Sequence, residues 1–267
     1  MERLGQHFLK NPAVLKKIAN ALDAQSGETI IEIGAGHGEL TEKIKNQISN
    51  IKIIAIEKDP SLIPVLRNKF SEAKSVEIIE GDVLKLLPEL CSMFHVSGFK
   101  IVGNIPYYLT GYLLRILGEL ERKPRRAVFT IQKEVALRIV AAPPKMNKLA
   151  ASVQFWAEPN IVGFVPKSDF HPAPKVDSAI VRLETGNREQ GTNDAENYYR
   201  AVQALFRQPR KTILNNLLDT EKQSENYIRG SAKEKIVKKL ARLGINPENR
   251  PQDLSVENII AIASIFS

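Results

Sequence analysis

Strand-like and helix-like segments alternate over the first two thirds of the chain, which predicts an α/β fold with a doubly wound, mostly parallel sheet. Two more observations complete this expectation. The strand-like runs 159–165 and 176–184 are separated only by a Pro-rich loop, so we expect an antiparallel hairpin at one edge of the sheet. Beyond residue 185 strand signals vanish, and we expect a small all-helical domain.

The parallel strands are expected where β-branched runs end in glycine or polar residues. Five segments have this pattern: 28–34, 51–57, 75–82, 99–104 and 125–132. Helical periodicity lies between them. In the segment 40–48, for example, Leu40, Ile44 and Ile48 share one helical face. Strands joined by helices in this way predict βαβ units.

A composition shift marks the expected domain boundary. The stretch "TGNREQGTNDAEN" (185–197) is polar and is typical of a linker. We therefore divide the chain into a domain of residues 1–185 and a helical domain of residues 186–267. Within the second, Ser231 and Glu234 have the spacing of a capping box, which predicts that a helix begins at Ser231.

Charge and composition limit the classes of protein. The chain of 267 residues has a formal net charge of +8, which favours a polyanionic partner. Its one cysteine, Cys91, allows no internal disulfide, and no paired-cysteine metal pattern is present. No signal-peptide core or membrane-spanning run occurs in the sequence. We expect a cytoplasmic protein without a metal and without a membrane association.

A glycine-rich turn follows the first predicted strand in "EIGAGHGEL" (32–40). Gly34, Gly36 and Gly38 allow a close approach of the backbone to a ligand. The dinucleotide fingerprint requires glycine where this chain has Glu39, and no phosphate-loop pattern follows, so a nicotinamide dehydrogenase is nearly excluded. Glu32 and Glu39 flank the turn and would suit a cationic ligand with an amino group.

Acidic residues end the next two predicted strands. Glu57 is placed to accept hydrogen bonds from ribose hydroxyls, and Asp82 is placed to accept from an adenine amino group. The carboxyl ends of parallel strands meet at one edge of the sheet, where open α/β folds bind ligands. A nucleoside without phosphate and with a cationic group is S-adenosylmethionine, which we predict as the cofactor.

The fourth strand ends in "GNIPYY" (103–108) at the same edge. A nucleobase amine is a poor nucleophile because its lone pair is delocalised into the ring. Two acceptors that bind its N–H groups localise that pair; we expect them to be the Asn104 side-chain oxygen and the Ile105 carbonyl, directed outward by Pro106. Tyr107 offers a face for base stacking, worth about 1–3 kcal/mol.

Several stretches, in this order, resemble the ribosomal RNA adenine dimethyltransferases: "GQHFL" (5–9), "EIGAGHGELT" (32–41), "IEKD" (56–59), "NIPYY" (104–108), "FTIQKEVALRI" (129–139) and "FHPAPKVDSAIVRL" (170–183). The resemblance implies a Rossmann-like class I methyltransferase fold. "LFRQPRKTILNNLL" (205–218) and "NRPQDLSVENI" (249–259) resemble the KsgA branch, which makes N6,N6-dimethyladenosine at two adjacent adenosines near the 3′ end of small-subunit (16S) ribosomal RNA.

The resemblance also implies site residues. Those matching the family's cofactor contacts are His7, Leu9, Gly34, Gly36, Glu57, Asp82 and Asn104. Those matching its target-base residues are Asn104, Ile105, Tyr107 and Phe170. Many members have Asn where this chain has His7. The implied partner is small-subunit rRNA within a pre-ribosomal 30S-type particle, bound by a monomer whose helical domain contacts RNA, with a role in ribosome biogenesis.

Other functions stay open at this point. The macrolide-resistance branch of the same family modifies a large-subunit adenosine. A third alternative belongs to another functional class: a ribosome-assembly factor that acts mainly by binding. Asn-Ile-Pro-Tyr alone also fits DNA or protein-amide methyltransferases, because these too act on planar conjugated nitrogens.

Overall fold

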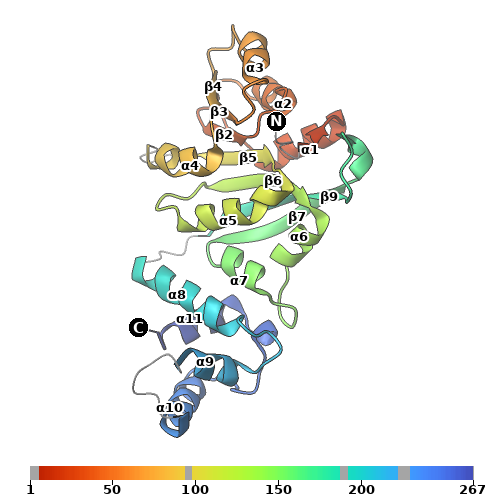
Figure 1. Ribbon diagram of the computed structural model, residues 1–267. Helices are drawn as coiled ribbons and strands as arrows, with labels where there is room; N and C mark the ends of the chain where they lie inside the picture. Colours follow the sequence, from red (N-terminus) through yellow and green to blue (C-terminus); the bar gives the residue numbers. More distant parts are fainter. Residues whose placement is uncertain (1–5, 94–97, 187–191, 222–228, 267) are drawn as a thin grey trace. The chain divides into compact units, whose positions relative to one another are not determined.

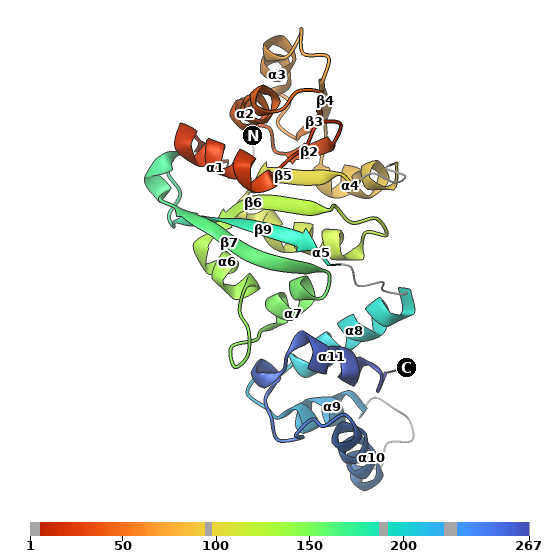
Figure 2. The ribbon, with the colours of Figure 1, turned by 180° about the vertical axis from the view of Figure 1, so that it is seen from behind.

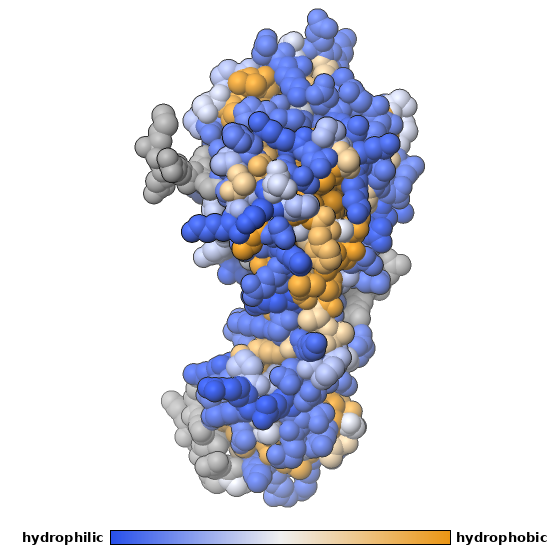
Figure 3. Space-filling view, turned by 90° about the vertical axis from the view of Figure 1, so that its right-hand side faces the viewer, coloured by the Kyte–Doolittle hydropathy of each residue, from blue (hydrophilic) through white to orange (hydrophobic). Residues whose placement is uncertain are grey.

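The computed structural model describes residues 6–93, 98–186, 192–221 and 229–266. The chain forms two compact units (Figure 1). Unit 1 contains residues 1–137 and 157–186, and unit 2 contains residues 138–156 and 187–267. Figure 3 shows a mainly hydrophilic surface on which apolar side chains gather in a strip over unit 1.

Unit 1 is built on a seven-stranded sheet with the order β4-β3-β2-β5-β6-β9-β7. Strands β2 to β6 are mutually parallel, while β9 runs antiparallel to both β6 and β7. The strands are β2 (Thr29–Ile33), β3 (Lys52–Glu57), β4 (Val76–Glu80), β5 (Lys100–Asn104), β6 (Arg126–Gln132), β7 (Ala157–Val165) and β9 (Ser178–Thr185). The predicted doubly wound sheet with an antiparallel edge pair is confirmed.

Helices connect the parallel strands in both directions from β2. The helices associated with the sheet are α1 (Pro12–Leu22), α2 (Glu39–Gln47), α3 (Ile63–Lys69), α4 (Val83–Ser92), α5 (Thr110–Glu119) and α6 (Lys133–Ile139). Right-handed crossovers place α2 and α3 on one face, and α4 and α5 on the other (Figures 1 and 2). Ligands bind where the direction of winding reverses, which here is between β2 and β5.

Alternating side chains explain how the sheet is covered on both faces. Ile30 of β2 packs in a core cluster with α1 and α2, whereas its neighbour Ile31 points to the other face and is equally buried. Helix α1 begins after Asn11, whose side chain accepts from the Ala13 amide, and Pro12 occupies its first turn. The N-cap and Pro12 define where the helix begins. The helix itself packs against β5, β6 and β9.

A second, two-stranded sheet joins distant parts of unit 1. Strand β1 (Phe8–Leu9) pairs antiparallel with β8 (Phe170–His171), and Leu9 lies opposite Phe170. Two short 3₁₀ helices, η1 (Tyr107–Leu109) and η2 (Lys167–Asp169), precede α5 and β8. The N-terminal segment is thereby held beside the carboxyl edge of the large sheet.

Unit 2 is helical. Its elements are α7 (Lys148–Gln154), α8 (Thr192–Leu205), α9 (Ile213–Glu221), α10 (Arg229–Arg242), η3 (Pro251–Asp253) and α11 (Val256–Ala263). Phe155 stacks on Tyr198 with ring centroids 3.8 Å apart, and the Tyr198 hydroxyl donates to the Ala151 carbonyl at 2.9 Å. Residues 138–156 thus share the core of unit 2, although the sequence division at residue 185 assigned them to the first domain.

Candidate active site

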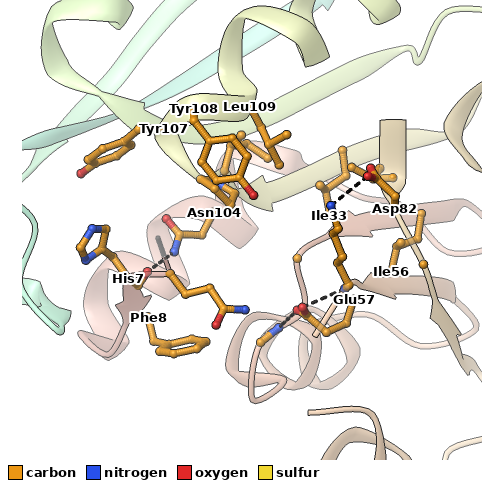
Figure 4. A pocket seen from close by; sticks show the side chains of 18 of the residues that line it. His7, Phe8, Ile33, Ile56, Glu57, Asp82, Asn104, Tyr107, Tyr108 and Leu109 are labelled. Carbon is orange, nitrogen blue, oxygen red and sulfur yellow. Dashed lines mark hydrogen bonds and ion pairs between the residues drawn. The ribbon is translucent and has the colours of Figure 1, made fainter. Parts of the chain in front are cut away.

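A pocket opens at the carboxyl ends of β2 to β5 (Figure 4). It encloses about 800 Å³ when the space open to solvent is included. It brings together predicted site residues from six segments of the sequence. These lining residues are His7, Gly34, Gly36, Glu57, Asp82, Asn104, Ile105, Tyr107 and Phe170.

The glycine-rich turn forms one wall. Gly34 and Gly36 have φ angles of +70° and +59°, which side chains rarely adopt. A Cβ at Gly36 would also lie only 3.1 Å from the Phe8 ring. Glycine at position 36 therefore allows both the turn and the close approach of the N-terminal segment.

Glu57 holds this turn from the end of β3. One carboxylate oxygen accepts from the Gly36 amide at 2.9 Å, and the other accepts from the amides of Lys58 and Asp59 at 2.9 and 2.8 Å. The side chain is almost fully buried. A carboxylate offers about four acceptor positions, so three backbone amides leave capacity for a hydroxyl of a bound nucleoside.

Asp82 stands at the end of the next strand and caps α4. Its carboxylate accepts from the Leu84 amide and forms an ion pair with Lys58 Nζ, both at 3.0 Å. Burial opposes its ionisation, but the hydrogen bonds from Lys58 and Leu84, with the charges of Lys58 and Lys85, hold the pKa of the carboxyl below its ordinary value. The carboxylate therefore remains an acceptor at neutral pH.

Lys58 is a pocket residue that the sequence argument did not single out. Its position directly after Glu57, at the end of β3, was the available signal. Its ammonium places a positive charge beside Asp82 on the same wall as Glu57.

Asn104 projects into the pocket from the end of β5, beside His7 (Figure 4). Its Nδ2 donates to the His7 carbonyl at 2.7 Å. Because a carbonyl oxygen only accepts, this contact fixes which end of the amide faces His7 and leaves Oδ1 as the free acceptor. The side chain is thus oriented by a residue 97 positions away in the sequence.

Gly103 explains how Asn104 reaches this position. A Cβ at residue 103 would lie 2.6 Å from the Ile33 carbonyl and 2.8 Å from Ile105 Cδ1. Glycine therefore allows β5 to approach the end of β2 closely.

Aromatic side chains line the other end of the pocket. The Tyr107 hydroxyl is hydrogen-bonded to Ser178 Oγ at 2.9 Å, and burial raises the pKa of this phenol against the opposing effect of Ser178. Phe170 is buried, while Tyr108 is exposed at the rim. Two ring faces, Tyr107 and Phe170, are therefore available to a planar ligand.

The N-terminal segment covers the pocket through His7 and Phe8. The His7 ring donates from Nδ1 to the Pro172 carbonyl at 2.8 Å, because a carbonyl oxygen only accepts; Nδ1 therefore carries the hydrogen. Leu9 differs from the expectation that it contacts the cofactor. Its side chain is buried in the core cluster and is not among the pocket-lining residues. A strand alternates its side chains, so Phe8 and Leu9 face opposite ways.

Glu32 and Glu39, expected to flank a cationic ligand, do not line the pocket. Glu32 is 1% exposed and accepts from Thr41 Oγ1 at 2.6 Å. Burial raises its pKa to about 8; the Thr41 hydrogen bond opposes this, and the charges of Glu39 and Glu57 add to it. The acidic lining consists of Glu57 and Asp82 instead.

Among the described residues, no cluster of three or more His, Cys, Asp or Glu side chains is arranged to hold a metal ion. Within the same residues, none of the helices is long and apolar enough to span a membrane.

The doubly wound sheet, the glycine turn without phosphate-binding pattern and the acidic residues ending β3 and β4 define a class I methyltransferase. A solved dimethyladenosine transferase from Plasmodium falciparum is 27% identical, with a TM-score of 0.79 over 97% of each chain. The 23S rRNA methyltransferase ErmE, 23% identical, has a TM-score of 0.72 over 96% of this chain and 98% of its own, which shows the fold alone.

The family model described as ribosomal RNA adenine dimethylase matches residues 1–265. A ribosomal RNA small subunit methyltransferase A from Dehalococcoides mccartyi is 38% identical over 99% of this chain and 87% of the relative. The chain therefore belongs to the ribosomal RNA adenine dimethylase family, whose methyl donor is S-adenosylmethionine.

Proposed function

We propose that the protein transfers methyl groups from S-adenosylmethionine to N6 of two adjacent adenosines near the 3′ end of 16S rRNA, giving N6,N6-dimethyladenosine. The observation that carries this proposal is the orientation of Asn104. Its Nδ2 is committed to the His7 carbonyl, so Oδ1 is presented to an N–H donor such as an exocyclic amine.

Ile105 supplies the second acceptor in this proposal. Its amide donates to the Thr130 carbonyl at 3.1 Å, and Pro106 restricts the backbone of Ile105, the residue before it. Two acceptors on the N6 hydrogens localise the nitrogen lone pair. S-adenosylmethionine, held by the pocket residues, would supply the methyl carbon that this lone pair attacks. The carbon–sulfur bond would break as the nitrogen–carbon bond forms, and the charged nitrogen would lose a proton to solvent. Positioning and electrostatic stabilisation supply most of the rate.

Tyr107 and Phe170 are proposed to hold the adenine between them. The hydrogen bond to Ser178 fixes the Tyr107 ring, and the pairing of β8 with β1 fixes Phe170. An adenine in helical RNA has a buried amine, so the nucleotide must first leave its stack. Base stacking of about 1–3 kcal/mol then offsets part of that cost.

The proposed cofactor residues are His7, Gly34, Gly36, Glu57, Asp82 and Asn104. They fit a nucleoside with a cationic centre, since two carboxylates and a glycine turn with positive φ angles line one cavity. When bound, S-adenosylmethionine supplies an electrophilic methyl group. Glu57 would then accept from the ribose, and Asp82 from the adenine amino group.

The small subunit is favoured over the large subunit by the names of the curated relatives. Labelled cofactor and under-methylated small subunits, followed by nucleoside analysis, test the assignment. We expect labelled N6,N6-dimethyladenosine, with reverse-transcription stops at two adjacent positions in small-subunit rRNA. Stops in large-subunit rRNA instead would support the resistance-type reaction and refute the proposal.

We further propose a monomer that acts in the cytoplasm on a pre-ribosomal 30S-type particle. The net charge of +8 supports binding to a polyanion. Affinity for the particle should fall steeply between roughly 50 and 500 mM salt, because binding releases counterions. A salt-independent affinity would contradict this.

The Asn104→Ala variant tests whether the protein acts mainly in assembly or mainly as a methyltransferase. If binding were the main work, the variant would restore particle maturation fully in a strain lacking the protein. We expect it to bind particles but to leave the adenosines unmethylated.

A further inference from the structure

An exposed aromatic–cationic patch lies outside the pocket, on unit 1. We call it the edge platform and define it as Lys133, Phe164 and Val176. Phe164 is 53% exposed on β7, and Lys133 Nζ lies 5.0 Å from its ring centroid. Val176 is 45% exposed. The Lys133 amide donates to the Asp177 carbonyl at 3.0 Å, which brings the start of α6 beside residue 176.

The edge platform continues the carboxyl edge that carries the adenine-binding residues. Ser178, which binds the Tyr107 hydroxyl, follows Asp177 and pairs with Val165, the residue after Phe164. The order β5-β6-β9-β7 separates Asn104 from Phe164 by three strand spacings, or about 14 Å. This distance is spanned by a few nucleotides of an unpaired strand.

Lys133 supplies the positive charge at the edge platform, since its Nζ lies 5.0 Å from the Phe164 ring centroid. Two more exposed lysines, Lys167 and Lys175, lie on the segment between β7 and β9, together with Asp169 and Asp177. The Asp177 carboxylate accepts the Lys167 amide at 3.1 Å. Lys17 Nζ lies against Gly163 and therefore on the opposite face of β7 from Phe164.

We propose that the edge platform receives an unpaired nucleobase of the RNA strand that flanks the target adenosine. An aromatic face beside an ammonium group matches a nucleotide, which carries a π-face and a phosphate. The edge platform lies on the same edge of the sheet as the proposed adenine site, so RNA is favoured over a protein partner. The inference rests on the proposed function, because it assumes that the target lies in RNA.

Kinetics on under-methylated small subunits provide the first test. Phe164→Ala and Phe164→Leu should raise KM about tenfold, the loss expected for one stacked base, with kcat nearly unchanged. Phe164→Tyr keeps the ring and should retain the wild-type KM. Val176→Ala has a matched control in Val65→Ala, since Val65 on α3 is 46% exposed. Only Val176→Ala should raise KM.

Fluorescence provides the second test. The chain has one tryptophan, Trp156, which is buried, so Phe164→Trp adds an exposed reporter. We expect a protein-free single-stranded RNA of the small-subunit 3′ end to quench it, with little quenching of Val65→Trp. A raised KM for Phe164→Ala without RNA quenching would indicate a protein partner and overturn the proposal.

The two hypotheses fail differently. If the wild type forms dimethyladenosine on the particle and Phe164→Ala has the same KM, the edge platform is refuted and the proposed function stands. If the wild type forms none, the proposed function is refuted, and the edge platform falls with it. Unchanged cofactor affinity in Phe164→Ala separates an RNA effect from damage to the pocket.

Discussion

Replacement of Glu32 by Gln should make unit 1 more stable, and increasingly so as the pH rises. Glu32 is the fourth of the five residues of β2 and is buried, with Thr41 Oγ1 at 2.6 Å. Burial raises its pKa to about 8 from an ordinary value of 4.5. Glutamine has the same shape and can still accept from Thr41, but it carries no charge to desolvate.

The sign and size follow from proton binding. Between pH 4.5 and 8 the folded protein holds a proton that the unfolded chain has released. The free energy of unfolding of the wild type therefore falls by about 1.4 kcal/mol per pH unit in this interval. Glu32 costs nothing below pH 4.5, and about 5 kcal/mol above pH 8. From pH 6 to pH 8 the gain from Glu32→Gln should grow by about 2 kcal/mol.

Urea denaturation at pH 6, 7 and 8 measures this difference. Far-UV circular dichroism is the suitable signal, because Trp156 belongs to unit 2 whereas Glu32 belongs to unit 1. Glu72→Gln, at an exposed position, controls for the loss of one acidic group. If Glu32→Gln lowers stability, or if its effect is the same at pH 6 and pH 8, the assignment of a protonated, buried Glu32 is wrong.

Three further substitutions probe the pocket. Gly103→Ala should destabilise unit 1 by about 1–3 kcal/mol in urea melts and abolish methylation, since its Cβ would meet the Ile33 carbonyl at 2.6 Å. Glu57→Gln should weaken cofactor binding in calorimetry by roughly tenfold or more, because a charged acceptor of three amides is lost; unchanged affinity would contradict its role. Ser178→Ala should free the Tyr107 ring, raising KM several-fold through a lost hydrogen bond of about 1 kcal/mol while cofactor affinity stays constant.

Much of the fold was predictable because its signals are local. β-branched runs ending in glycine, asparagine or acidic residues predicted the parallel strands. The prediction that a helix begins at Ser231 is wrong. Helix α10 already includes it, and Glu234 pairs with Lys238 at 2.7 Å instead of closing a capping box.

Of the pocket, the sequence predicted mainly the residues that lie at the carboxyl ends of parallel strands. Glu57, Asp82 and Asn104 meet because parallel strands share one carboxyl edge. The contact between Asn104 and His7 and the burial of Leu9 accompany the pairing of β1 with β8, and strands of two residues leave no periodic pattern in the sequence. Glu32 is buried on β2, where it contacts Thr41 of α2. The packing of residues 138–156 with the C-terminal helices is likewise a tertiary property, carried by Phe155 and Tyr198.

The hydrogen bond from Asn104 to the main chain at His7 has a practical implication for handling the protein. Proteolytic removal of the residues up to position 9 would remove the main-chain oxygen of His7, which every substitution at position 7 retains. Such a trimmed enzyme would keep its seven-stranded sheet but lose the contact that fixes the rotamer of the Asn104 side chain. Preparations for assay are therefore better tagged at the other end of the chain and checked by mass spectrometry for an intact amino terminus.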